Sequence, residues 1–219
     1  ATLQAGGEFL VRSIDGDVIG RGALTLRAGS TDTDSLRIET QGASAGNILL
    51  GSASRLVAGE DRDGGLTLRV RDASNRVSIG AVSARALRGA VGTADAANGL
   101  ALNGPVAVGD VDVRDALSIS ASDLTSGAVA SDGSVSLVTT DTLLAGSVTA
   151  RRGSAVLQAG GGVQVAGAID ARGSRSDVLV RAGGAIGLGD VKAGRDVLVS
   201  NMTTADRASI SGNVEAGRN

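Results

Sequence analysis

The chain has 219 residues and a formal charge of −2, from 21 basic and 23 acidic side chains, which argues against a strong electrostatic footprint for nucleic acid. It contains neither cysteine nor histidine, and this excludes disulfides, thiolate metal sites, a serine–histidine pair and a typical zinc site. No apolar run reaches the roughly 18 residues that a membrane span requires, so we expect no membrane insertion. We also expect no cofactor.

The apolar residues are almost all Ala, Val, Leu and Ile, and Phe9 is the only aromatic residue. Ordinary globular cores use large rings to fill irregular space. A core of small aliphatic side chains therefore predicts a narrow interior of constant cross-section. The 34 glycines and the single proline, Pro105, predict many turns with positive φ and few breaks in β ladders.

The first half of the chain holds two copies of a short pattern, which is Gly, any residue, Val or Ile, any residue, then a small or apolar residue. The copies are GDVIG from Gly16 and GAVSA from Gly80. Between about 30 and 75 the pattern does not give a coil register. Polar segments are expected to form turns that absorb insertions: 31–35, 60–65 and 92–99.

From residue 109 onward the pattern becomes regular. Its copies begin at Gly109, Gly127, Gly146, Gly167, Gly189 and Gly212, which lie 18 to 23 residues apart. Apolar triplets fill the gaps, and we expect their leucines to align with one another: Leu137, Leu157, Leu179 and Leu198. Within each copy the apolar positions alternate, as in Val111 and Val113, which predicts short strands with one buried face.

These repeats predict an all-β parallel β-solenoid of roughly 20-residue coils. We expect residues 1–219 to form a single β-helical repeat domain that is a fragment of a longer fibrous protein. Outward positions on successive coils should form a ladder of alternating charge, made by Asp170, Lys192 and Glu215. Val191, which directly precedes Lys192, should face inward and lie in a buried column.

Two segments carry a resemblance to a known family. They are GSVTARRGSAVLQAGGGVQVAGAIDARG and RAGGAIGLGDVKAGRDVLVSN, in which "AG" or "ARG" turns separate short Val and Leu strands. The chain resembles the filamentous haemagglutinin family of two-partner-secretion exoproteins, most clearly from about residue 100 to the end. The Ala-, Gly- and Arg-containing repeats are most similar to those of the Bordetella type.

This resemblance implies a right-handed parallel β-helix and a shaft segment of a secreted or cell-surface adhesin that mediates attachment to host cells. It also implies export through an outer-membrane partner, and a host glycan or receptor bound by the parent protein. Two features of the family are missing. The amino-terminal secretion domain of the family carries Asn-Pro motifs, whereas Pro105 follows Gly104. The family's Arg-Gly-Asp attachment triplet also has no match, and the nearest strings are RDG from Arg62 and RGA from Arg21.

Two other functions remain open. A β-helical carbohydrate-active enzyme or phage-tail-like domain would use Asp110 with Asp112 and Asp115, or Asp61 with Asp63, because paired carboxylates perform acid–base chemistry. We favour a non-enzyme, since the chain lacks the Trp and Tyr platforms that carbohydrate sites commonly use. The shaft of a contact-dependent inhibition toxin would have the same repeats.

A weak binding site is also conceivable at one edge of the solenoid. Arg151, Arg152 and Arg172 follow the strand pattern and should lie close together on neighbouring coils. We hypothesise weak contact between this edge and sulfated glycans, which retention on heparin at physiological salt would test. No catalytic, cofactor-binding or metal-binding residue is predicted.

Overall fold

The computed structural model describes residues 1–41, 46–203 and 207–217. These residues form 28 strands and no helix, and the strands stack in parallel sheets as a β-solenoid of about nine turns with about 22 residues per turn. The predicted all-β parallel solenoid is therefore confirmed. The chain divides into two compact units, unit 1 (residues 1–114) and unit 2 (residues 115–219).

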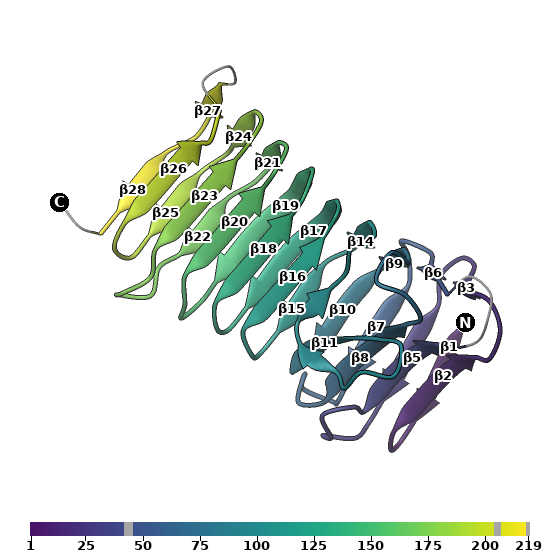
Figure 1. Ribbon diagram of the computed structural model, residues 1–219. Helices are drawn as coiled ribbons and strands as arrows, with labels where there is room; N and C mark the ends of the chain where they lie inside the picture. The colour runs from purple at the N-terminus through teal and green to yellow at the C-terminus, as the bar shows by residue number, and fades with distance from the viewer. Residues whose placement is uncertain (42–45, 204–206, 218–219) are drawn as a thin grey trace. The chain divides into compact units, whose positions relative to one another are not determined.

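Unit 1 contains three columns of parallel strands, each of which takes one strand from successive coils (Figure 1). The first column is β1 (Thr2–Ala5), β4 (Thr25–Ala28), β7 (Arg55–Ala58), β10 (Ala81–Ala84) and β15 (Val111–Val113). The second is β2 (Phe9–Ser13), β5 (Leu36–Thr40), β8 (Gly65–Val70) and β11 (Ala86–Val91). The third is β3 (Val18–Gly20), β6 (Ile48–Leu50), β9 (Val77–Ile79) and β14 (Val106–Val108). Two short strands follow β11, namely β12 (Ala97–Asn98), which pairs antiparallel with β11, and β13 (Leu100–Ala101).

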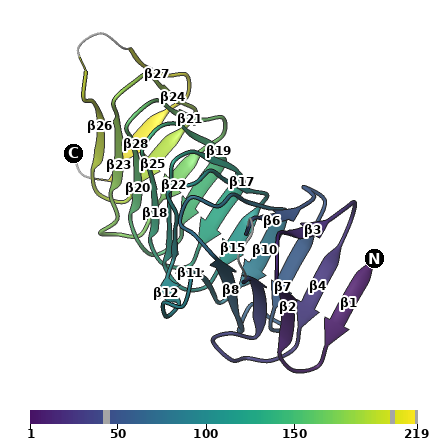
Figure 2. The same ribbon diagram turned by 45° about the vertical axis from the view of Figure 1, so that its right-hand side comes forward.

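Unit 2 contains one sheet of five strands, β16 (Leu117–Ala121), β18 (Val135–Thr139), β20 (Ala155–Ala159), β23 (Val178–Ala182) and β26 (Val197–Asn201). In the first two coils the remaining residues form one long strand each, β17 (Leu124–Ser131) and β19 (Leu143–Ala150). Later coils split it into two short strands: β21 (Val163–Val165) with β22 (Ile169–Ala171), β24 (Ile186–Leu188) with β25 (Val191–Ala193), and β27 (Ala208–Ile210) with β28 (Val214–Ala216). Figure 2 shows these coils stacked as closed turns.

The structure supplies the register that the sequence left open between about 30 and 75. Leu36 pairs with Leu66, 30 residues further on, and Ile48 pairs with Val77. Segments 31–35 and 60–65 lie mainly in turns, as predicted, and 92–99 holds the turn before the short strand β12. Long coils in unit 1 thus keep their strands aligned by placing the additional residues in turns.

Buried aliphatic columns fill the interior of unit 2. The pattern residues that follow the repeat glycines pair in register and are buried: Val129, Val148, Ile169 and Val191. Each such side chain contributes roughly 1.5–3 kcal/mol relative to an exposed one. The alternation of buried and outward positions in β19, β20 and β23 confirms the period-2 reading.

Two predicted alignments are wrong. Leu137 pairs with Leu157, but Leu157 pairs with Val180 rather than with Leu179, so Leu179 and Leu198 face outward, and Leu198 is 52% exposed. A shift of one residue along a strand moves a side chain to the opposite face. The two copies of the glycine pattern in unit 1 also lie in different columns. The copy at Gly16 leads into β3 in the third column, whereas the copy at Gly80 leads into β10 in the first column.

The repeat glycines of unit 2 are required by close approach between coils. A Cβ atom on Gly167 would lie 2.8 Å from the carbonyl oxygen of Gly146, and one on Gly189 would lie 2.5 Å from that of Gly167. The glycines with positive φ among the described residues all belong to unit 1: Gly16, Gly22, Gly59, Gly92 and Gly99. The expectation that glycines serve positive-φ turns therefore holds only there.

Candidate functional site

The predicted arginine edge lies at turns of unit 2, and each of its guanidinium groups faces a carboxylate. Arg151 Nη1 lies 2.6 Å from Asp132 Oδ1, and Arg152 Nη2 lies 3.8 Å from the other oxygen of that carboxylate. Arg172 Nε lies 3.0 Å from Asp170. Arg152 is the most open of the three, with 79% of its side chain exposed. Two aspartates thus compensate much of the positive charge on which a polyanion would depend.

The aspartates considered for catalysis lie on and beside strand β15, and, for Asp61 and Asp63, in the turn between β7 and β8. Asp112 faces outward from β15 and forms an ion pair with Arg62 at 2.6 Å. Asp110 precedes the same strand in unit 1, whereas Asp115 belongs to unit 2. Within residues 1–41, 46–203 and 207–217, no group of three or more acidic side chains is arranged to hold a metal ion.

The predicted charge ladder is present on the outer face of β22, β25 and β28. Asp170 pairs in register with Lys192, which pairs with Glu215. Lys192 Nζ lies 3.5 Å from a Glu215 carboxylate oxygen. Exposed ion pairs of this kind contribute about 0–1 kcal/mol each, so the ladder sets charge complementarity between coils rather than most of the stability.

A second polar device connects the coils at the residue just before a strand. Asp17 Oδ1 accepts a hydrogen bond at 2.8 Å from the backbone N–H of Asn47, and Asn47 Oδ1 accepts one at 2.8 Å from the backbone N–H of Arg76. In unit 2, Ser154 Oγ accepts one at 3.0 Å from the backbone N–H of Asp177, which precedes β23. A short side chain in one coil thus satisfies a backbone donor in the next.

Asp177 belongs to the same device and also binds Arg195. Its Oδ1 accepts hydrogen bonds from Arg195 Nε at 2.7 Å and from the Asp196 N–H at 3.2 Å, and its Oδ2 bonds to Arg195 Nη2. The hydrogen bond to Asp177 and the charge of that carboxylate raise the pKa of Arg195 above its ordinary value. Arg195 and Asp177 thus hold the turns of two successive coils together.

Sequence reasoning missed a charged cluster in unit 1 that surrounds Glu39. This side chain is only 2% exposed, and it lies in register between Arg12 on β2 and Arg69 on β8. Arg12 Nε and Arg37 Nε donate to its two oxygens at 3.0 and 3.2 Å, Arg69 Nε lies at 3.7 Å, and Gln41 Nε2 donates at 3.3 Å. The clue in the sequence was opposite charge at positions 27 and 30 residues apart, which the missing register concealed.

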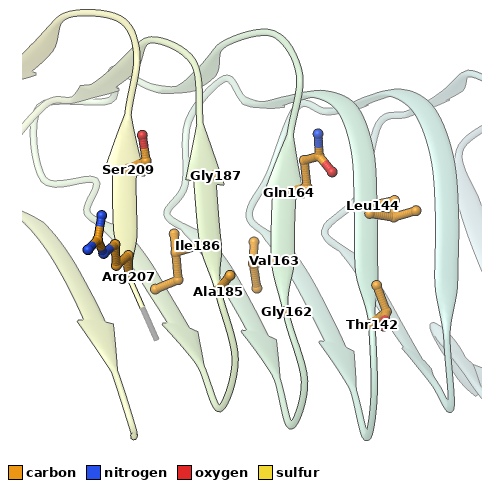
Figure 3. A pocket seen from close by; sticks show the side chains of 10 residues that line it. All are labelled: Thr142, Leu144, Gly162, Val163, Gln164, Ala185, Ile186, Gly187, Arg207 and Ser209. Carbon is orange, nitrogen blue, oxygen red and sulfur yellow. The ribbon is translucent and has the colours of Figure 1, made fainter. Parts of the chain in front are cut away.

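A shallow groove of about 430 Å³ runs over the outer face of β19, β21, β24 and β27 in unit 2 (Figure 3). The outward residues of these strands pair in register: Leu144, Gln164, Gly187 and Ser209. Gly187 makes the hollow, because a Cβ there would meet only the Gln164 side chain, at 3.8 Å. Arg207 and Thr142 lie at the two ends of the groove in the close-up view.

The residues that line this groove limit its chemistry. Its lining holds one amide, one guanidinium, two hydroxyls and aliphatic or glycine positions, without a carboxylate among the lining residues described. Glycoside hydrolysis normally needs two carboxyl groups, and this groove presents none. Its surface suits contact with another surface better than acid–base catalysis.

Comparison of the chain with protein-family models, with curated proteins and with solved structures finds no match in any of the three. The described part of the chain also contains no helix long and apolar enough to cross a membrane.

Proposed function

We propose that this chain is a structural shaft segment of a secreted or cell-surface adhesin of the filamentous haemagglutinin kind. In this proposal the parent protein uses two-partner secretion, passes through an outer-membrane transporter and binds a host glycan or receptor through other segments. The chain itself acts mechanically, as a spacer, and not as an enzyme. A toxin shaft would use the same mechanics.

The observation that carries the proposal is the continuous register of parallel strands within each unit. Buried columns such as Val148, Ile169 and Val191 recur from coil to coil, and outward charges face opposite charges on the same or the neighbouring coil. A backbone ladder of this kind resists extension because each strand is bonded to the next. The absence of cysteine suits export of an unfolded chain, since no disulfide has to form.

Pulling on the two ends of the chain in a single-molecule force experiment tests this mechanical role. We expect stepwise release, with each coil of about 22 residues adding roughly 70–80 Å of extended chain. One abrupt extension of the entire chain at low force would contradict the spacer role. Hydrolysis of a bacterial or host polysaccharide by the purified chain would favour the enzyme instead.

A further inference from the structure

The groove of unit 2 has a projecting side chain on one side of its central residue, Gln164, and a hollow on the other side. Along the outward row, Leu144 projects on one side of Gln164 and is 37% exposed, while Gly187 leaves a hollow on the other side. Thr125 and Ser209 occupy the next positions outward in the same row. A projecting side chain and a hollow therefore lie at equal distances from Gln164, one coil away in opposite directions.

The charges at the rim follow the same arrangement. The residues just before β17, β19, β21, β24 and β27 form a second row, which begins at Asp123 and ends at Arg207. Asp123 accepts hydrogen bonds from the Thr142 N–H and the Ser122 hydroxyl, at 3.3 and 3.2 Å. Among the described residues neither Asp123 nor Arg207 has an ion-pair partner. The row thus has a basic residue at one end of the groove, Arg207, and an acidic residue, Asp123, one strand beyond Thr142 at the other end.

We propose that this groove is a docking surface for a second copy of the same chain, related by a two-fold axis that runs parallel to β21 over Gln164. Such an axis reverses the order of coils but keeps positions along the strands. Leu144 of each copy then enters the hollow over Gly187 of the other. Asp123 of each copy meets Arg207 of the other, and the two Gln164 amides face each other and form paired hydrogen bonds.

The size of the patch sets the expected strength of the contact. Five strands at about 4.8 Å spacing and about four residues along each strand cover on the order of 300 Å² per copy. Stable interfaces bury about 800 Å² per partner. We therefore expect a weak contact, with a Kd on the order of 0.1–1 mM, that associates shaft segments sideways when many copies are held close together.

A single cysteine at the two-fold axis gives a sharp test, because the chain has no cysteine of its own. Gln164→Cys places two thiols opposite each other in the proposed dimer. Gln158→Cys is the matched control, since Gln158 is an exposed outward glutamine of the same coil on the sheet that contains β20. With oxidised glutathione as oxidant, we expect Gln164→Cys to form disulfide-linked dimers at least tenfold faster than Gln158→Cys.

Two further variants in the Gln164→Cys background separate docking from random collision. A Cβ atom on Gly187 would meet only the Gln164 side chain, at 3.8 Å, and the position faces outward, so we expect Gly187→Leu to fill the hollow, leave thermal unfolding unchanged and abolish the tenfold advantage. Asp123→Lys should also abolish the advantage, and the swap Asp123→Lys with Arg207→Asp should restore it.

Equal dimer formation by the two cysteine variants would overturn the proposal and leave the groove to a different occupant. Unchanged dimer formation by folded Gly187→Leu would overturn it as well. Neither result would affect the mechanical role, which the force experiment tests separately.

Discussion

Unit 1 and unit 2 stack strands in the same way but differ in the length and the turns of their coils. Registered strands lie up to 30 residues apart in unit 1, as Thr25 and Arg55 do, and 18 to 23 residues apart in unit 2, from Leu117 and Val135 to Val191 and Val214. Additional residues in unit 1 enter turns, several of them with positive-φ glycine. Strand register is therefore set by the buried columns, whereas turns tolerate variation in length.

The two units also use polar residues differently. Unit 1 covers Glu39 with three arginine side chains on the outer face of one sheet. Unit 2 places its ion pairs in turns and on exposed faces, as between Arg151 and Asp132. Close glycine contacts between coils occur in both units: an added Cβ atom would lie 2.0 Å from the Ser54 carbonyl oxygen at Gly80 and 1.9 Å from the Gly160 carbonyl oxygen at Gly183. Three substitutions separate these contributions, beginning with a buried column of unit 2.

Val191→Asp should have the largest effect. Val191 is 0% exposed in a column of Ile169 and Val214, so the carboxylate would enter the core without a partner. We expect a loss of at least about 4 kcal/mol or unfolding of the surrounding coils. Urea denaturation followed by circular dichroism measures this. The neighbouring outward change Lys192→Ala is the control, and an unfolding midpoint for Val191→Asp equal to that of the control would mean that the side chain does not face inward.

Gly183→Ala should have an intermediate effect. Its Cβ would lie 1.9 Å from the Gly160 carbonyl oxygen, which belongs to the backbone and cannot turn aside. We expect a loss of about 2–3 kcal/mol from this overpacking, again measured by urea denaturation.

Gly187 in unit 2 and Gly16 in unit 1 serve as controls, because neither has a close backbone contact. Gly187→Ala finds its nearest heavy atom at 3.8 Å and should change stability by less than about 0.5 kcal/mol. Gly16→Ala in unit 1 has open space but a φ of 98°, so backbone strain alone should cost about 1–2 kcal/mol. Equal losses for Gly183→Ala and Gly187→Ala would contradict the close-approach explanation.

Glu39→Gln should have the smallest of the three effects. The change removes the negative charge that Arg12, Arg37 and Arg69 share, but it keeps a side chain of the same shape. Because the arginines are partly exposed, we expect a loss of about 1–2 kcal/mol rather than that of a fully buried pair. Thermal unfolding in low and high salt checks the cause, since a loss independent of salt would argue against an electrostatic origin.

The sequence predicted the solenoid class and the ladder of Asp170, Lys192 and Glu215 because unit 2 repeats its glycine and valine positions at nearly constant spacing. It did not predict the register of unit 1, where coil length varies and the glycine pattern lapses. The nearly identical segments ATLQAGG (1–7) and AVLQAGG (155–161) show why sequence alone does not assign a strand to its sheet. The first contains β1 and the second contains β20, which lies in a different sheet. Local similarity does not decide the column when turn length is free to vary.

The groove and the Glu39 cluster were not predicted for a related reason. Each depends on which outward residues become neighbours, such as Gln164 beside Gly187, and that follows only from the register. The arginine edge shows the converse. Its residues follow strands as the sequence predicted, and the structure adds which carboxylates face them, those of Asp132 and Asp170.

Residue-resolved hydrogen exchange, measured by NMR, shows whether the long coils of unit 1 hold their strands in register as firmly as the short coils of unit 2 do. The account predicts that strand amides of unit 1, such as Leu66 and Leu68, are as strongly protected as Leu137 and Leu157 of unit 2. Exposed turn amides, such as those of Thr33 and Asp61, should exchange quickly. Exchange of the Leu66 and Leu68 amides as fast as that of those turns would contradict it.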